Sequence, residues 1–343
     1  MEQIAIGFQL DETLVERIAN SFPNIPVLHR PELLAPRRYP CDHIGDTSTF
    51  GSAEQKDALK KAFSKATILL GSPLSGPDGV REIVLACPNL KWLQSPASGF
   101  AETLDAAALP PSARQQVMFT TAAGVHAQQL AEWALMSLLY FRKDIPQLLQ
   151  DQTSHRWRTR PFDELADSSV LVLGLGHVGR QVANKCQAMG VRVIGVGKGT
   201  PEDQYWRLDE TDDAEVLRNL VLESDAVVLC LPHTQTTAGL FSKALIDALP
   251  DHGIVVNIGR GTTIDNEALL LALTEGRLRG AALDVTSPEP LPDNHQLWNL
   301  PNVLLSSHSA ALSLREDERL VDLFIQNLGR YLSGDRLSNL LDP

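Results

Sequence analysis

The chain has 343 residues, 43% of them hydrophobic and 21% charged, which is typical of an ordered globular protein long enough for two domains. Its formal net charge is −12 at pH 7. A nucleic-acid-binding surface needs clustered lysine and arginine, so this charge argues against a nucleic-acid partner and confines any anion site to a local patch.

The first third of the chain alternates short apolar runs with helix-like stretches. Residues 3–8, 66–72 and 90–95 predict strands, and residues 53–65 predict a helix. This alternation predicts an α/β domain at the N-terminus.

Residues 126–145 predict a long helix, because alanine, leucine, glutamine, glutamate and methionine dominate and neither glycine nor proline interrupts them. Apolar side chains cover nearly the whole circumference of this helix, which therefore needs burial on several sides. Burial within one subunit would satisfy this need, and burial against a second subunit would satisfy it equally. We favour a homodimer.

From residue 169 to about residue 307, strand-like and helix-like stretches alternate regularly. The strand-like runs are apolar without strict alternation, as strands buried on both faces are, and they predict a doubly wound parallel sheet. The acidic segment after residue 312 predicts a helix that packs back on the first domain.

A glycine-rich turn follows the first of these runs. Gly174, Gly176 and Gly179 form a GxGxxG pattern, which allows a tight turn, close approach of a pyrophosphate and close helix–sheet packing. The pattern alone is weak, but its position between a strand and a helix-compatible stretch favours a dinucleotide site. About 20 residues further on, where an NAD-specific site has Asp or Glu, the chain has Gly197 and Lys198. Lysine attracts a 2′-phosphate, so we expect NADP(H) to be favoured over NAD(H); the alternative is a solvated lysine.

Three polar residues follow later apolar runs. Arg260, Glu289 and His308 would meet at one edge of the sheet, because residues beyond the carboxyl ends of parallel strands converge. Reduction of a 2-oxo acid needs a cation to hold the carboxylate and polarise the carbonyl, and an acid to protonate the alkoxide. Arg260 suits the first task, His308 suits the second, and Glu289 would orient the imidazole. Taken singly, Arg260 could be a solvated arginine, Glu289 could lie in a surface turn and His308 could be a structural histidine.

Four widely spaced cysteines form no CxxC and no Cys/His cluster at metal-ligand spacing, so we expect free thiols and no metal site. The N-terminal residues do not have the pattern of a secretory signal, and no apolar stretch approaches the roughly 20 residues needed to cross a bilayer. We therefore expect a cytoplasmic protein without a membrane partner.

Together these residues resemble the D-isomer-specific 2-hydroxyacid dehydrogenase family, especially its glyoxylate/hydroxypyruvate reductase branch. The resemblance runs from about residue 90 to residue 313. It is carried by the motifs LKWLQSPASG, TTAAGVHAQQLAEW, LVLGLGHVG, VVLCLPHTQTTAGL, VVNIGRGTTIDNEAL, GAALDVTSPEPLP and LLSSHSAA, in this order. In two departures, His177 replaces a frequent arginine and Ser307 replaces the proline that usually precedes the acid/base.

The resemblance implies roles for individual residues. Arg260 would bind and polarise the substrate, His308 would be the acid/base and Glu289 its partner. The backbone N–H groups of Ser98 and Gly99 would bind the substrate carboxylate. The residues implied for the cofactor are Gly174, Gly176, His177, Val178, Gly179, Gly197, Lys198, Leu231, Pro232, Ile258, Gly259, Asp284 and His308.

The resemblance also implies two Rossmann-like or flavodoxin-like doubly wound domains with a cleft between them. Residues 1–118 and 312–343 would form a discontinuous substrate-binding domain, residues 119–311 the NAD(P)-binding Rossmann domain, and the helix near His126 a homodimer. The implied activity is reversible, NAD(P)H-dependent reduction of a small 2-oxo acid, such as glyoxylate or hydroxypyruvate, to the D-2-hydroxy acid. A dinucleotide-gated dimeric corepressor with little turnover is the alternative. The substrate's side chain and the physiological direction stay open.

Overall fold

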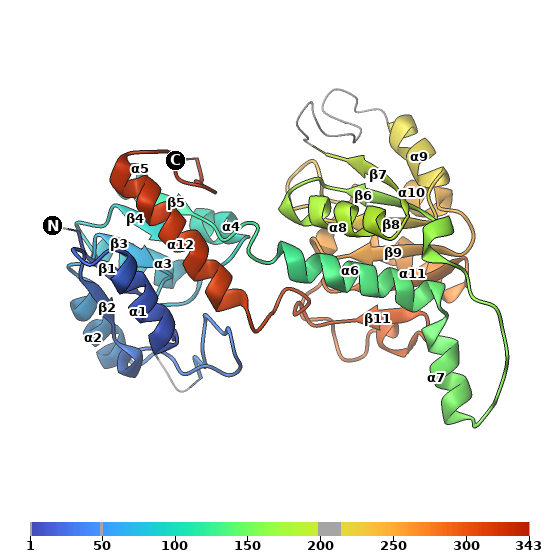
Figure 1. The fold of residues 1–343 in the computed structure, drawn as a ribbon, viewed down its shortest axis with the longest axis horizontal. Helices are drawn as coiled ribbons and strands as arrows, with labels where there is room; N and C mark the ends of the chain where they lie inside the picture. The colour runs from blue at the N-terminus through green and yellow to red at the C-terminus, as the bar shows by residue number, and fades with distance from the viewer. Residues whose placement is uncertain (1, 49–50, 198–213, 343) are drawn as a thin grey trace. The chain divides into compact units, whose positions relative to one another are not determined.

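The computed structural model describes residues 2–48, 51–197 and 214–342. The chain divides into two compact units, Met1–His126 with Leu312–Pro343 and Ala127–Ala311. Each unit is built on a parallel sheet of its own that is covered by helices (Figure 1). The expected α/β class with two parallel-sheet domains is confirmed.

The sheet of the first unit has the strand order β2-β1-β3-β4-β5, and all neighbours are parallel. Its strands are β1 (Ile4–Ile6), β2 (Val27–His29), β3 (Ile68–Leu70), β4 (Trp92–Gln94) and β5 (Met118–Thr120). This order is that of flavodoxin-like doubly wound folds. Because successive side chains of a strand point to opposite faces, Ile4 and Ile6 join one core cluster and Ala5 joins the other.

Helices from both ends of the chain cover this sheet. One face packs against α1 (Glu12–Ser21) and α12 (Glu316–Ser333). The other face packs against α2 (Ala53–Phe63), α3 (Gly76–Ala86) and α4 (Phe100–Ala106), with the 3-10 turn η1 (Pro31–Leu33) and α5 (Pro111–Gln116) beside them. The C-terminal helix is tied to the sheet by Phe324, whose ring stacks on Trp92 with the centroids 5.1 Å apart. It therefore packs on the first unit, as expected.

The second sheet has the order β11-β10-β9-β8-β6-β7 and is also parallel throughout its described strands. These strands are β6 (Ser169–Leu173), β7 (Arg192–Val196), β8 (Ala226–Leu229), β9 (Gly253–Asn257), β10 (Leu278–Leu283) and β11 (Val303–Leu305). Apolar clusters cover both of its faces, which explains why the runs lack strict alternation. β7 and β8 lie on opposite sides of β6, so the strand order switches at β6, where ligands of such sheets bind.

Helices pack on both faces of the second sheet (Figure 1). One face carries α6 (Ala127–Arg142) and α8 (His177–Ala188), and the other carries α9 (Ala214–Leu222), α10 (Lys243–Ala248) and α11 (Asn266–Thr274). The helix expected over residues 126–145 ends earlier, at Arg142, and α7 (Ile145–Thr153) follows it. The break lies at Asp144, whose φ is 49°, and Pro146 then stands in the first turn of α7, where proline is tolerated.

The first junction between the units lies at His126 rather than at residue 118. The physical reason is β5, which pairs in register with β4 and so keeps the residues around it in the first unit. The second junction lies between Ala311 and Leu312. No helix in the described parts of the chain combines the length and apolarity that a bilayer crossing requires.

Candidate active site

The carboxyl edge of the second sheet gathers segments from five strands. Backbone hydrogen bonds extend the ladder just beyond the strands: Gly174 N to Val196 O at 2.7 Å, Ile258 N to Leu229 O at 3.1 Å, Asp284 N to Asn257 O at 3.0 Å and Ser306 N to Leu283 O at 3.0 Å. The segments after β6, β8, β9, β10 and β11 therefore lie along one edge, as the sequence predicts for a parallel sheet.

Glu289 and His308 are brought into contact at this edge. Oε1 of Glu289 lies 2.6 Å from Nδ1 of His308, although the two residues are 19 positions apart. A carboxylate only accepts hydrogen bonds, so Nδ1 carries a proton and Nε2 is the nitrogen left to exchange one with a ligand. The side chain of His308 is 48% exposed and that of Glu289 is 42% exposed, so the pair is accessible to a small molecule.

Asp284 holds the loop that carries His308. Its buried Oδ1 accepts hydrogen bonds from Ser306 Oγ at 2.6 Å and from the backbone N–H groups of Ser309 and Ala310 at 2.9 Å each. Its backbone carbonyl accepts from the N–H of His308, also at 2.9 Å. His308 has a φ of 50°, in the left-handed region that non-glycine residues rarely adopt. These bonds offset the cost of that conformation.

Arg260 follows β9, and β10 separates β9 from β11. Its backbone carbonyl accepts from Asn257 Nδ2 at 2.9 Å and from Thr263 Oγ1 at 2.7 Å, and its Nη1 donates to the carbonyl of Gly259 at 2.9 Å. Since neighbouring strands lie about 4.8 Å apart, the loops of Arg260 and His308 begin roughly 10 Å from each other. A small acid between them could contact both side chains.

The sequence did not identify Asn257 or Thr263 as contributors to this site. Asn257 is 1% exposed. Besides its bond to the carbonyl of Arg260, it accepts from the N–H of Gly259 at 3.0 Å, so it holds two consecutive residues of the loop. One signal was available: an amide at the end of an apolar strand needs hydrogen-bond partners when it is buried.

The glycine turn after β6 has the geometry that a pyrophosphate requires. Gly174 has a φ of 100°, and a Cβ at Gly179 would lie 1.8 Å from the carbonyl oxygen of Gly174, so the helix could not pack this closely with another residue there. A Cβ at Gly176, in contrast, would meet nothing within 4 Å. In the described chain no side chain caps the N-terminus of α8 at Gly176, so its N–H groups can bind an anion. The turn therefore fits a dinucleotide.

Several other residues expected at the cofactor follow strands at the same edge of the sheet, as Asp284 and His308 do after β10 and β11. His177 and Val178 begin α8, Gly197 follows β7, and Leu231 and Pro232 follow β8. Ile258 and Gly259 are buried after β9, and a Cβ at Gly259 would lie 2.5 Å from the carbonyl oxygen of Leu231. Lys198, on which the preference for NADP(H) depends, lies outside the described residues.

Ser98 and Gly99 lie in the first unit, directly before α4. In the part of the chain that the structure describes, their backbone N–H groups donate no hydrogen bond. They are therefore free to bind a carboxylate. The side chain of Ser98 is held by Nδ1 of His126 at 3.0 Å and by the carbonyl of Ala122 at 3.2 Å.

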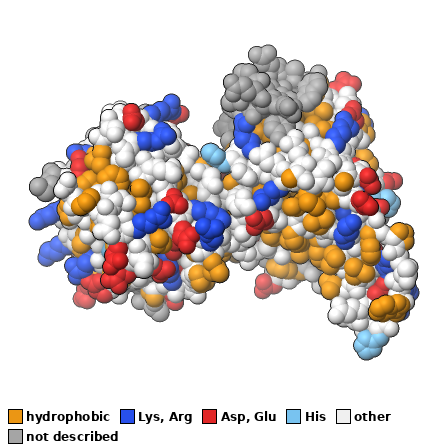
Figure 2. Space-filling view, in the orientation of Figure 1, with side chains coloured by type: hydrophobic (Ala, Val, Ile, Leu, Met, Phe, Trp, Pro, Cys, Tyr) orange, Lys and Arg blue, Asp and Glu red, His pale blue; other side chains and the backbone are white. Residues whose placement is uncertain are grey.

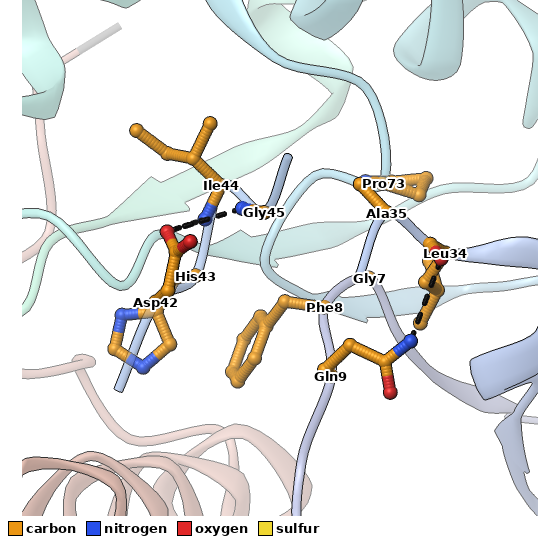
Figure 3. A pocket seen from close by; sticks show the side chains of 10 residues that line it. All are labelled: Gly7, Phe8, Gln9, Leu34, Ala35, Asp42, His43, Ile44, Gly45 and Pro73. Atoms are coloured by element: carbon orange, nitrogen blue, oxygen red, sulfur yellow. Dashed lines mark hydrogen bonds between the residues drawn. The ribbon is translucent and has the colours of Figure 1, made fainter. Parts of the chain in front are cut away.

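The first unit also contains a small cavity beyond the ends of β1 and β3. Figure 3 shows the side chains that line it, among them Phe8, His43 and Asp42, whose carboxylate is turned toward the N–H groups of Ile44 and Gly45. Burial raises the pKa of Asp42, but these bonds and the guanidinium of Arg38 outweigh it and hold that pKa below its usual range. The cavity measures about 10 Å³, which is room for one water molecule and not for a substrate.

Among the described residues, no three His, Cys, Asp or Glu side chains are grouped as a metal site would require. The chemistry that these side chains offer is binding of an anion, polarisation and proton transfer.

Comparisons with known proteins identify the family. The family model of the NAD binding domain of D-isomer specific 2-hydroxyacid dehydrogenases matches residues 135–310. A glyoxylate/hydroxypyruvate reductase A of Arabidopsis thaliana is 27% identical over 290 residues, which cover 83% of this chain and 88% of that protein.

Solved structures share the fold. A D-isomer specific 2-hydroxyacid dehydrogenase of Xanthobacter autotrophicus Py2, in complex with NADPH and MES, superposes with a TM-score of 0.76 at 24% identity and covers 100% of this chain and 98% of its own. The NADPH-dependent glyoxylate/hydroxypyruvate reductase of Sinorhizobium meliloti, in complex with NADP and sulfate, has a TM-score of 0.74 at 24% identity with the same coverage. The chain belongs to the D-isomer-specific 2-hydroxyacid dehydrogenase family and is an NAD(P)-dependent oxidoreductase.

Proposed function

We propose that this enzyme reduces a small 2-oxo acid, such as glyoxylate or hydroxypyruvate, to the D-2-hydroxy acid with NADPH, in a reversible reaction. The contact that carries this proposal is the 2.6 Å pair of Glu289 and His308, which prepares an imidazole to donate a proton. The names of the relatives in Arabidopsis and Sinorhizobium support the substrate class. We place the activity in the cytoplasm, where the four free thiols stay reduced.

The glycine turn and its neighbours would hold the dinucleotide. Gly174, Gly176 and the N-terminus of α8 would bind the pyrophosphate, and Lys198 would attract the 2′-phosphate that distinguishes NADPH from NADH. A bound NADPH supplies the hydride that reduces C2 of the substrate.

The side chains of the second unit perform the remaining steps. Arg260 binds the substrate carboxylate and polarises the carbonyl at C2, where negative charge develops. Nε2 of His308 donates its proton to the oxygen at C2 as the alkoxide forms, and takes it back in the reverse direction. Glu289 accepts the hydrogen bond of Nδ1 and so fixes the orientation of the ring, with Nε2 as the nitrogen that exchanges the proton. We also propose that the backbone N–H groups of Ser98 and Gly99 bind the substrate carboxylate.

We also propose that the second unit forms a homodimer through α6 and α7. A groove on α6 is lined by Leu135, Met136, Leu139, Tyr140 and Ile145, with Glu132 and Lys143 at its margin. Figure 2 shows hydrophobic side chains gathered over this part of the unit. Leu149 on α7 is 51% exposed and Trp157 beyond it is 99% exposed. Exposed apolar surface of this kind favours burial against a second copy of the same surface.

A panel of 2-oxo acids, each assayed with NADPH and with NADH, tests the proposed activity. We expect NADPH to be consumed with glyoxylate or hydroxypyruvate, and the product of hydroxypyruvate to be the D-2-hydroxy acid. The fall in NADPH absorbance measures its consumption, and chiral chromatography identifies the product of hydroxypyruvate. Tight NADPH binding without turnover of any acid would instead favour the dinucleotide-gated corepressor.

His308→Asn removes the proton donor with little backbone strain, since asparagine tolerates a positive φ better than most residues do. We expect kcat to fall by about 10²–10⁴-fold with the dissociation constant of NADPH unchanged. His155→Asn is the matched control, because His155 is also exposed and has a φ of 52°. Turnover of His308→Asn near that of the control would remove His308 from the mechanism.

Lys198→Asp reverses the charge proposed to bind the 2′-phosphate. We expect the ratio of kcat/KM for NADPH to that for NADH to fall by about tenfold or more, because the new carboxylate repels the phosphate. Lys61→Asp, an exposed position of α2, controls for the change in net charge. An unchanged ratio in Lys198→Asp would show that cofactor choice is made elsewhere.

The dimer is tested by placing a charge in its proposed interface. Met136→Asp and Leu149→Asp, at side chains 41% and 51% exposed, should convert a dimer into monomers in analytical ultracentrifugation. Leu271→Asp on α11, at a side chain 48% exposed, should leave the dimer intact. A monomeric wild-type protein, or dissociation only in the control, would contradict the proposed interface.

A further inference from the structure

Ser98 is the outermost of three side chains that are linked by hydrogen bonds and lead into the first unit. Its Oγ lies 3.0 Å from Nδ1 of His126, and Nε2 of His126 lies 3.0 Å from Oε1 of Glu316. Ser98 is exposed, whereas the side chains of His126 and Glu316 are only 13% and 5% exposed. The imidazole of His126 therefore connects a surface turn with a buried carboxylate.

The buried end of this chain is anchored by several charged groups. Nδ1 of His43 lies 3.6 Å from Glu316 Oε1, and Nε2 of the same ring lies 2.7 Å from Asp317 Oδ1. Arg37 donates from Nη2 to Asp317 Oδ2 at 2.7 Å. Burial raises the pKa of Asp317, but His43 and Arg37 outweigh it and keep that pKa below its usual value. Glu316 stands next to Asp317 at the start of α12 and is itself buried, so it offers His126 an acceptor that is shielded from solvent.

The orientation of His126 follows from this acceptor. A carboxylate accepts only, so Nε2 of His126 carries a proton. In the neutral ring Nδ1 is then the acceptor, and Ser98 donates its hydroxyl proton to it. In the protonated ring Nδ1–H donates to Ser98 Oγ, and the hydroxyl can turn to the carbonyl of Ala122 at 3.2 Å. His126 therefore holds the side chain of Ser98 in either charge state.

We propose that His126 is a positioning residue for substrate binding: anchored by Glu316, it holds Ser98 so that the N–H groups of Ser98 and Gly99 point at the carboxylate of the 2-oxo acid. This inference rests on the proposed function, in which these N–H groups bind that carboxylate. His126 does not touch the reacting atoms, so its removal should weaken binding of the acid and leave the chemical step and the dinucleotide site intact.

Two variants of His126 separate its two contacts. Gln places an amide N–H where Nε2 lies, so His126→Gln keeps a donor for Glu316 and loses the partner of Ser98. Asn places an amide where Nδ1 lies, so His126→Asn keeps a partner for Ser98. We expect His126→Gln to raise KM for glyoxylate and hydroxypyruvate about three- to tenfold, with kcat and the dissociation constant of NADPH unchanged, as loss of one hydrogen bond predicts. His126→Asn should restore KM to near the wild-type value.

A double-mutant cycle shows whether His126 acts through Ser98. Ser98→Ala should raise KM by a similar factor, and the double variant Ser98→Ala/His126→Gln should bind no worse than Ser98→Ala alone, because both remove the same contact. His29→Gln is the matched control, since His29 is a half-buried imidazole of the same unit that contacts the carbonyl of Phe8 and should not change KM. Additive effects, or an unchanged KM in His126→Gln, would overturn the inference.

Binding of oxalate to the enzyme with NADP⁺, measured by calorimetry, provides a readout without turnover. We expect His126→Gln to weaken the dissociation constant of oxalate by the same factor as KM. If the wild-type enzyme turns over no 2-oxo acid but binds oxalate, and His126→Gln weakens this binding, the proposed activity fails and the role of His126 stands. If the wild-type enzyme reduces glyoxylate and oxalate binds equally well to wild type and variant, the role of His126 fails alone.

Discussion

The buried carboxylate of Asp284 fixes the loop on which the proposed chemistry depends. It is 2% exposed and binds three groups of the segment that follows β11, so this segment cannot move as a free loop. His308 is thereby held in a left-handed conformation with Nδ1 against Glu289. The loop keeps this shape although Ser307 stands where the family usually has proline. The buried carboxylate of Asp284, which accepts three hydrogen bonds, therefore stiffens the loop of His308 without a proline at position 307.

The loop of Arg260, which follows the neighbouring strand β9, is also held by buried polar side chains. Asn257, buried at the end of β9, accepts from the N–H of Gly259 and donates to the carbonyl of Arg260, and the hydroxyl of Thr263 donates a third bond to that carbonyl. Both proposed catalytic loops therefore rest on polar side chains at the ends of buried strands. Precise placement matters here, because small displacements of a general acid or a carboxylate-binding group reduce rates strongly.

Much of this arrangement could be predicted from the sequence. Apolar runs without alternation indicated parallel strands buried on both faces, and parallel strands bring the residues beyond their carboxyl ends to one edge. The contact between Glu289 and His308 follows from that rule, although 19 residues separate the two. The glycine turn was recognisable because each glycine has its own steric reason, most clearly Gly179 against the carbonyl of Gly174.

Other features depend on interactions that periodicity does not encode. The boundary at residue 118 followed from the family resemblance and not from periodicity, and the pairing of β5 with β4 is visible only in the folded chain. The helix over residues 126–145 was predicted as one piece because its composition favours a helix throughout, whereas the break at Asp144 is a local backbone conformation. The contacts of His126 join it to residues 28 and 190 positions away, which meet it only in the folded chain.

A crystal structure of the enzyme with NADP⁺ and oxalate would test the central claim most directly. We expect the guanidinium of Arg260 and Nε2 of His308 both to form hydrogen bonds to the oxalate, with Nδ1 of His308 still bound to Glu289. An oxalate bound at the nicotinamide with either side chain turned away from it would contradict the account.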